Sequence, residues 1–445
     1  MRKLALVLII LLPILACLCL VGIYFIPPVH DRLAWRLEDF YLRVAYLLNP
    51  PAKAVFIPTQ QGVLLPTVAS QATGQSAGIT QTQSAPTITL TPTPAGPTAT
   101  PTVTLSPTPL PTPLPDHVTL PGVRFQDQGG GRLNYCAPAN LAMALSFWGW
   151  PGDLDIAGPV LKPDKKDKNV MPYEMADYVA NNTNLGVVLR LGGDLDLIRR
   201  FLAAGFPVLV EKGTYLHDLT GVVSWMGHYQ VITGYDEVGA YFITQDSFVG
   251  ADHQVKYEDM LRGWRAFNYT YLVIYPNERE AQVLGLLGPD ADETANYQNA
   301  ALKASNEIYG LSGVDQYFAW FNRGSSLVKL EDYAGASLAF DEAFKVYPNI
   351  PEAERPWRML WYQTGPYFAY YGVGRFYDLL YLADGTLKSM QSDKNLEESY
   401  YWRGMARAAL GEQAAAIEDF RLSLKFHPGF EPAIYQLKLL GVENP

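Results

Sequence analysis

The stretch that decides the fold is residues 134–148, which read NYCAPANLAMALSFW. Its apolar residues recur at helical spacing after Cys136, so the sequence predicts a helix that begins at or near this cysteine. The unsatisfied N–H groups and the positive dipole end of a helix N-terminus favour the thiolate, which is the nucleophilic form of cysteine. A buried structural thiol is the alternative interpretation of the same residues.

The positions of the cysteines argue against an internal disulfide framework, and the net charge argues against binding to nucleic acid. Cys17 and Cys19 lie in an N-terminal apolar segment, so Cys136 has no disulfide partner in the folded part of the chain. The N-terminal apolar segment would place Cys136 outside the cytoplasm, where a solitary thiol risks oxidation. This risk favours a functional role for Cys136. The net charge is −10, and the one basic run is at 165–168. Binding to nucleic acid therefore has no electrostatic support.

The N-terminus predicts attachment to a membrane. Residues 4–26 are apolar after two cations, so residues 1–28 are expected to form a transmembrane signal anchor. The protein would then be a single-pass protein of the cell membrane, with its C-terminal region extracytoplasmic. A cleaved signal peptide and lipidation at Cys17 are the alternatives. Residues 29–57 predict an amphipathic juxtamembrane helix, and residues 58–116 a disordered Thr/Pro-rich stalk.

Two folded units are expected after the stalk. Residues 117–278 predict an α+β domain in which helices come first and a run of antiparallel strands second. Residues 290–440 predict an all-α helical repeat domain, because the segment contains an internal repeat at an offset of 80 residues. The matching pairs are Gly324 and Gly404, Leu330 and Leu410, Ala336 and Ala416, Phe340 and Phe420, and Pro348 and Pro428.

A base for the thiol is expected at His228. This histidine leads into a strand that turns near Gly239 and returns to Asp246. If Gly239 takes the left-handed position of a three-residue loop, Asp246 lies opposite Gln230 and diagonal to His228. A two-residue or four-residue loop would place His228 and Asp246 on opposite faces. The three-residue loop suits a carboxylate that orients an imidazole, which in turn draws the proton from the Cys136 thiol.

Acyl transfer also requires hydrogen-bond donors for the oxyanion, commonly a backbone N–H at the nucleophile and a side-chain amide. Gln126 and Gln128 precede Cys136 and are the candidates. Gln128 is preferred because it is nearer to the cysteine. An ordinary polar loop residue is the alternative for each.

Three motifs together resemble cysteine peptidase family 39, a group of papain-like proteins typified by the bacteriocin leader peptidases. They are the Cys136 stretch, GHYQVITGY at 227–235 and ITQDS at 243–247, in the order of the family. The resemblance covers the α+β segment and implies a papain-like fold. It also implies that Cys136 is the nucleophile, His228 the base and Asp246 the residue that orients it. An upstream glutamine would complete the oxyanion hole.

Two features depart from the family pattern. The usual Cys-Gly-Pro is Cys136-Ala137-Pro138 here, which adds a methyl group beside the nucleophile. Residues 129–132 look like an insertion that sets the glutamine further back. Both features bear on turnover more than on the fold.

The C-terminal repeat resembles tetratricopeptide repeats, in which small residues let paired helices approach closely. Residues 350–398 are expected to form a degenerate middle repeat with an insertion, which would complete a minimal stack. Repeats of this kind imply binding of a protein partner. A packing appendage to the α+β domain is the alternative.

Taken together, the residues predict a membrane-anchored extracytoplasmic cysteine peptidase that cleaves peptide bonds through a thioester, with no cofactor and no metal. One alternative is a papain-like binding or scaffold module that has lost turnover. Another is a different thiol acyl transfer, such as cell-wall amide cleavage or transamidation.

Overall fold

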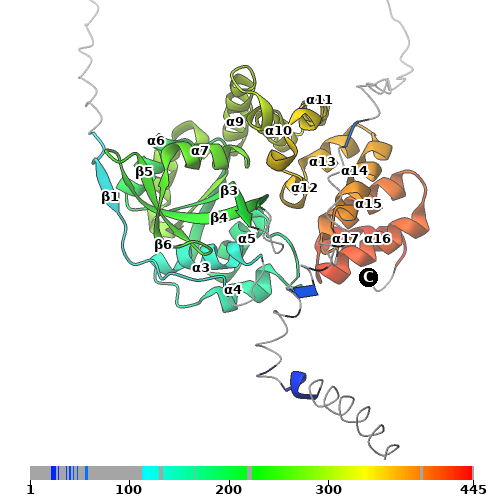
Figure 1. Ribbon diagram of the computed structural model, residues 1–445, viewed down its shortest axis with the longest axis horizontal. Coiled ribbons are helices and arrows are strands. Elements are labelled where there is room, and N and C mark those ends of the chain that lie inside the picture. Colours follow the sequence, from blue (N-terminus) through cyan, green and yellow to red (C-terminus); the bar gives the residue numbers. More distant parts are fainter. Residues whose placement is uncertain are drawn as a thin grey trace, which may run out of the picture.

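The computed structural model describes residues 22–26, 29, 37, 40, 41, 44, 48, 56–58, 113–129, 134–164, 166–217, 223–390 and 394–442. Within them, an α+β domain that contains a sheet is followed by a region of paired helices (Figure 1). The structural class expected for each of the two folded units is therefore confirmed.

The sheet of the α+β domain is antiparallel throughout. Its strands are β1 (His117–Thr119), β2 (Leu185–Arg190), β3 (Val208–His217), β4 (Val223–Asp236), β5 (Tyr241–Asp246), β6 (Gly250–Lys256) and β7 (Tyr271–Pro276). They pair in the order β2-β7-β3-β4-β5-β6, and β1 pairs with β4. The long strand β4 thus lies at the centre of the domain.

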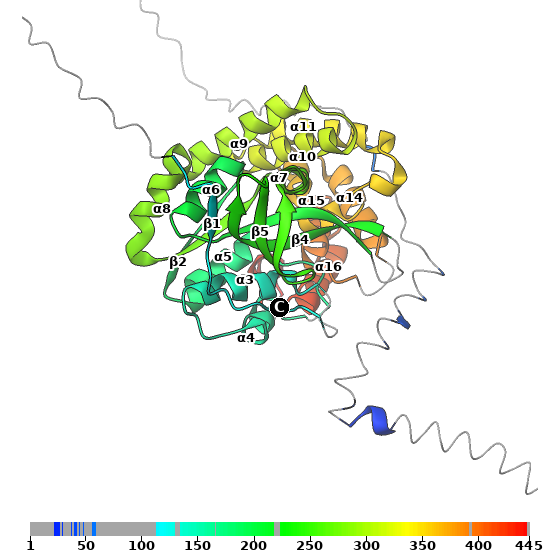
Figure 2. The same ribbon diagram turned by 60° about the vertical axis from the view of Figure 1, so that its left-hand side comes forward.

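Helices cover both faces of this sheet. They are α3 (Cys136–Phe147), α4 (Leu154–Leu161), α5 (Pro172–Asn182), α6 (Leu195–Ala203), α7 (Tyr257–Arg265) and α8 (Glu280–Leu287). The first three share a buried cluster with Leu209 and Val231, and the last three share another with Val208 and Ile232. Neighbouring residues of β3 and of β4 therefore point to opposite helical layers, as the alternation of a strand requires. Figure 2 shows these layers on the two sides of the sheet.

The predicted order of helices and strands is only partly correct. Strand β2 lies between α5 and α6, so a strand interrupts the helical part of the chain. It pairs along its whole length with β7, from Leu185 opposite Pro276 to Arg190 opposite Tyr271. Because this partner is distant in sequence, no local hairpin signal marked β2.

Helix α3 begins at Cys136, and all residues from Ala137 to Ser146 are buried. A helix that is apolar on every side is typical of a protein core. Asn134 precedes it in the left-handed conformation, with φ of 58°. Asparagine is one of the few side chains that adopts this conformation readily, so the chain can turn sharply before the cysteine.

The hairpin between β4 and β5 differs from the expected one. Its strands pair as far as Asp236 opposite Tyr241, which leaves a four-residue loop. Ala240, with φ of 50°, takes the left-handed conformation that was expected for Gly239. The reason is a turn in which the Asp236 carboxylate accepts a hydrogen bond from the Gly239 backbone at 2.6 Å. A side chain at Gly239 would instead collide with the Tyr241 ring.

A bulge in β4 compensates for the longer loop. The register shifts by one residue between Ile232 and Gly234, and beyond the bulge Val231 lies opposite Gln245. The extra residue of the loop and the extra residue of the bulge cancel each other. The pairing of β4 with β5 near His228 is therefore the expected one, although the loop and the bulge that produce it were not expected.

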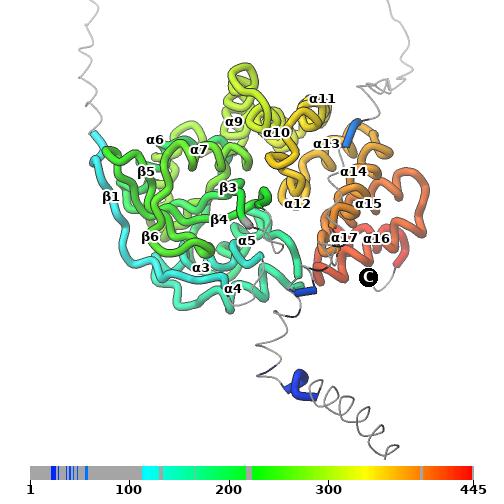
Figure 3. The backbone as a smooth tube through the Cα atoms, viewed as in Figure 1, coloured from blue at the N-terminus to red at the C-terminus, as the bar shows by residue number. Residues whose placement is uncertain are grey.

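The C-terminal region is a series of helices: α9 (Glu293–Ile308), α10 (Gly313–Lys329), α11 (Tyr333–Val346), α12 (Met359–Tyr362), α13 (Gly365–Gly372), α14 (Phe376–Lys388), α15 (Glu397–Ala409), α16 (Gln413–Phe426) and α17 (Glu431–Leu439). They follow an arc that starts beside the α+β domain at α9 and ends near α5 at α17 (Figure 3). The residues expected to form a middle repeat contain α12, α13 and α14.

The two matching helix pairs, α10 with α11 and α15 with α16, have the same contact at their crossing. A Cβ added at Gly324 would lie 2.7 Å from the Phe340 ring, and one added at Gly404 would lie 2.7 Å from the Phe420 ring. Glycine is therefore required where the helices cross, which explains the small residue of the repeat pattern.

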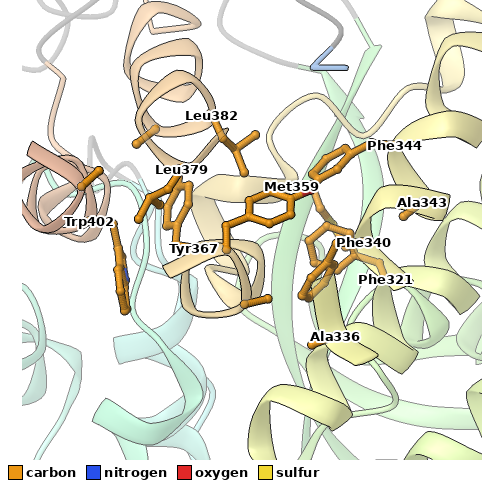
Figure 4. Close-up of a cluster of buried hydrophobic side chains, with 14 of the residues drawn as sticks. Phe321, Ala336, Phe340, Ala343, Phe344, Met359, Tyr367, Leu379, Leu382 and Trp402 are labelled. Carbon is orange, nitrogen blue, oxygen red and sulfur yellow. The ribbon is translucent and has the colours of Figure 1, made fainter. Parts of the chain in front are cut away.

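The repeats share a core with the α+β domain. Buried Phe321, Phe340, Met359 and Tyr367 pack together between the helices (Figure 4). The same cluster includes Trp225, Ala266 and Phe267 of the α+β domain. Burial of apolar surface therefore continues across the junction, which favours a fixed arrangement of the two units.

Most of the predicted anchor and stalk lies outside the described residues. Among the residues that are described, no helix is long and apolar enough to cross a membrane. Five described residues of the predicted juxtamembrane helix are helical and have exposed side chains: Leu37, Phe40, Tyr41, Val44 and Leu48. Their spacing places them on one face of a helix, so this face is apolar and uncovered.

Candidate active site

The site lies where the N-terminus of α3 meets the edge of β4. The Cys136 thiol is partly buried and interacts with the His228 side chain and with the backbone of Tyr229. The ladder between β4 and β5 ends at the pair Val231 with Gln245, and β5 itself ends one residue later at Asp246. His228 thus lies on the part of β4 that extends beyond this ladder.

The three residues expected to form a catalytic set are close together. His228 and Asp246 are both buried, and the His228 Nε2 atom lies 2.8 Å from the Asp246 Oδ1 atom. Gln230 donates a hydrogen bond to the other carboxylate oxygen. The Asp246 Oδ1 atom also accepts the backbone N–H groups of Phe248 at 2.8 Å and Val249 at 3.1 Å. Asp246 therefore caps the strand end and contacts the imidazole at the same time.

The charged forms of Asp246, His228 and Cys136 stabilise one another. Burial opposes ionisation of Asp246, but its hydrogen bond to His228 lowers its pKa below the usual range. Burial lowers the pKa of His228, but the Asp246 carboxylate and then Cys136 outweigh it and raise that pKa to about 9. Burial raises the pKa of Cys136, but the hydrogen bond to His228 produces a net lowering. The arrangement favours a thiolate beside an imidazolium.

Gln128 is tied to the nucleophile by a short relay of hydrogen bonds. The Ser247 hydroxyl donates to the Gln128 Oε1 atom at 2.7 Å, and Asn140 donates to the same hydroxyl at 2.9 Å. Asn140 also donates to the backbone oxygen of Cys136 at 2.8 Å. With its oxygen held by Ser247, the amide nitrogen of Gln128 is available to donate. This relay favours Gln128 over Gln126 as the candidate side-chain donor to the oxyanion.

The methyl group of Ala137 is accommodated by the core. Ala137 is 1% exposed and belongs to the buried cluster under α3. The departure from the usual glycine thus fills space between the helices and the sheet.

Models of two known families match separate parts of the chain. Residues 121–273 match the Peptidase_C39 like family. Residues 319–350 and 397–429 match the tetratricopeptide repeat, whereas α12–α14 lie outside both matches. No curated protein matches the chain. A solved structure described as a C39-like peptidase from Bacillus anthracis matches at 18% identity and a TM-score of 0.28, over 36% of this chain and 96% of its own.

Two buried ionisable residues of the C39-like domain, Lys162 and Glu211, lie near Cys136 and were not expected from the sequence. The Lys162 ammonium donates to the backbone oxygens of Asn134 at 3.0 Å and Asp167 at 2.8 Å, so it fixes the turn before the cysteine. Burial lowers its pKa to about 8. Glu211 is buried on β3, and burial raises its pKa well above the usual range. No spacing pattern in the sequence links either residue to Cys136.

The repeats also contribute a residue to this site. Tyr362 of α12 packs its ring against Trp225 and Phe267, and a side chain at Gly227 would collide with both the Phe267 and Tyr362 rings. Burial raises the pKa of Tyr362 to about 12, with a further contribution from nearby Cys136. The glycine before His228 therefore makes room for aromatic side chains, one of which comes from the repeat region.

Proposed function

We propose that the C39-like domain is a papain-like cysteine peptidase that hydrolyses peptide bonds. The observation that carries the proposal is His228, whose Nε2 is hydrogen bonded to Asp246 and whose side chain also interacts with the Cys136 thiol. A base held between a nucleophile and a buried carboxylate is the arrangement required for acyl transfer.

The reaction would proceed in two steps. The Cys136 thiolate adds to the carbonyl carbon of the peptide, and the backbone N–H at Cys136 and the amide of Gln128 stabilise the oxyanion. The His228 imidazolium then gives its proton to the leaving amine, and the C–N bond breaks to leave a thioester. In the second step His228 takes a proton from water, which attacks the thioester and releases the acid and the thiol. Asp246 orients the imidazole throughout.

The remaining parts of the proposal concern location and partners. The repeats bind a protein partner or substrate, which is supported by the match to tetratricopeptide repeats. The N-terminal segment anchors the chain in the cell membrane, with the C39-like domain on the extracytoplasmic side. The apolar stripe formed by Leu37, Phe40, Tyr41, Val44 and Leu48 supports an amphipathic helix that lies at a membrane surface.

A peptide library tests whether the site turns over. The full chain is incubated with peptides derived from a whole proteome, and new termini are identified by mass spectrometry. We expect cleavages by the wild type that disappear in Cys136→Ser, because the hydroxyl is far less acidic than the thiol. Identical termini with both proteins would contradict the proposal. Strong thiol labelling without any cleavage would favour the inactive binding module.

The oxyanion assignment can be tested separately on any peptide that is cleaved. We expect Gln128→Ala to lower kcat by about 10²-fold, the usual effect of losing one oxyanion donor. Alkylation of Cys136 by iodoacetamide should stay unchanged, because the thiolate is stabilised by His228. Gln126→Ala is the matched control and should retain near wild-type kcat. The reverse pattern in the two variants would assign the role to Gln126.

A further inference from the structure

A second cluster of ionisable side chains lies at the junction between the C39-like domain and the repeats. Glu174 comes from the first turn of α5, Glu397 begins α15, and His427 follows the end of α16. One oxygen of each carboxylate and one nitrogen of the imidazole all lie within 4.8 Å of one another. The cluster therefore joins three helices that are far apart in the sequence.

The distances within the cluster are close to those of a ligand set. The His427 Nδ1 atom lies 3.1 Å from the Glu397 Oε1 atom and 3.9 Å from the Glu174 Oε1 atom. A tetrahedral ion with bonds of about 2.0 Å holds its ligand atoms about 3.3 Å apart. Small side-chain movements would thus bring the three atoms around one ion.

The second carboxylate oxygen of Glu397 gives independent support for a ligand at this cluster. Its side chain is 3% exposed, and its Oε2 atom has no hydrogen-bond partner in the part of the chain that the structure describes. Burial of a carboxylate oxygen without a partner is costly, because the hydration that stabilises its charge is lost. This oxygen lies on the carboxylate that already contacts His427, so it points to a missing ligand in the cluster.

Further negative charge surrounds the three residues. Asp167 and Glu398 are also buried, and both lie close enough to interact electrostatically with Glu397. Lys162 interacts with Asp167 and donates hydrogen bonds to the backbone oxygens of Asn134 and Asp167. Carboxylates that two domains present to each other at a buried junction repel, and either protonation or a bound cation relieves that repulsion.

From this geometry we propose that Glu174, Glu397 and His427 bind a divalent transition metal ion such as Zn²⁺. The imidazole ligand selects this class, because Mg²⁺ and Ca²⁺ prefer oxygen ligands alone. Glu174 is already oriented for this, since its Oε2 atom accepts the Met171 backbone N–H at 2.6 Å and its Oε1 atom faces His427. Water would complete the coordination, because Glu174 and His427 are partly exposed.

The proposed ion would connect the two domains. Glu174 belongs to the C39-like domain, whereas Glu397 and His427 belong to the repeats. An ion bound to all three would stabilise the docked arrangement and leave the unfolded chain with a weaker site. Its expected effect is therefore structural, and it does not depend on whether Cys136 turns over peptides.

The test uses the full chain with all three cysteines replaced by serine, so that no thiolate competes for the metal. After treatment with a chelator, Zn²⁺ is titrated against a chromophoric competitor, and thermal unfolding is followed with and without Zn²⁺. We expect one ion to bind per chain and Tm to rise. Because changes in outer-shell partners alone alter metal affinity 10–100-fold, His427→Ala should weaken binding by at least about 100-fold.

Two further variants make the outcome decisive. Glu397→Gln removes one charged ligand, and it should lose the Zn²⁺-dependent rise in Tm while the metal-free protein becomes no less stable, because repulsion at the junction is relieved. His253→Ala, on β6 of the C39-like domain, is the matched histidine control and should bind Zn²⁺ like the parent. Absence of saturable binding, or binding that survives His427→Ala, would overturn the proposal. So would a preference for Ca²⁺ over Zn²⁺.

Discussion

His228→Ala is expected to lower the reactivity of Cys136 sharply at neutral pH. In the wild type the imidazolium holds the pKa of the thiol below its usual range against the effect of burial. Without this cation the buried thiol should have a pKa at or above the ordinary value of about 8.5, so about 3% or less is thiolate at pH 7. Alkylation by iodoacetamide should therefore slow, by about 30-fold where the wild-type thiol is fully ionised at pH 7, and peptide hydrolysis should slow by about 10³-fold or more because the base is also lost.

The pH dependence of the wild type follows from the same pair. Labelling should persist at pH values below the usual thiol pKa, because the thiolate is present above the lowered pKa of Cys136. Hydrolysis also needs the imidazolium proton for the leaving amine, and this proton is lost as the pH rises through about 9. Turnover should thus follow a bell-shaped profile, whereas labelling should have no falling limb.

The matched control is His253→Ala, which removes a partly exposed histidine of the same domain. It should leave both the labelling rate and its pH profile unchanged. Labelling of Cys136 is measured by mass spectrometry of the peptide that contains it, so that Cys17 and Cys19 do not contribute. Equal labelling of wild type and His228→Ala across the pH range would show that the thiolate is not stabilised by the imidazole.

Arg375→Met is expected to produce the largest loss of stability in the repeats. The Arg375 guanidinium is buried and pairs with Asp341 at 2.7 Å and with Asp378 at 2.8 Å. The Tyr370 hydroxyl also donates to Asp341. Removal of the cation would leave the two buried carboxylates without the charge and the hydrogen bonds that Arg375 supplies. The free energy of unfolding should fall by about 3–5 kcal/mol, as is usual when one partner of a buried ion pair is removed.

Equilibrium unfolding in urea measures this effect. Arg262→Met is the matched control, because Arg262 pairs with Glu258 and Asp259 on an exposed surface of α7. Its replacement should change the free energy of unfolding by less than about 1 kcal/mol, since exposed ion pairs contribute little. Similar losses in the two variants would mean that the buried network contributes no more than a surface pair does.

Local sequence patterns predicted the elements that depend on neighbouring residues. The helix after Cys136 and the strands around His228 and Asp246 follow from the spacing of apolar residues, which reports local hydrogen bonding and burial. The repeat offset likewise predicted the matching helix pairs, α10 with α11 and α15 with α16. The structure adds that in both pairs the repeated glycine lies against the repeated phenylalanine.

The register of the hairpin shows where local prediction ends. The loop from Glu237 to Ala240 has one residue more than expected, and the bulge between Ile232 and Gly234 restores the pairing. The contact between His228 and Asp246 was thus anticipated for an incorrect reason. A loop of this length is selected by the turn at Asp236, whereas the bulge depends on how β4 pairs with its neighbours in the folded sheet.

The sequence by itself determined the nucleophile candidate, its histidine and aspartate, the order of the two folded units and the repeats. Tertiary structure alone decided that Tyr362 lies near Cys136 and that Glu174 lies beside Glu397 and His427. These residues come together because the helices of the repeats fold back on the C39-like domain and share its buried core. Periodicity along the chain carries no signal for such contacts, since they depend on packing between elements that are distant in sequence.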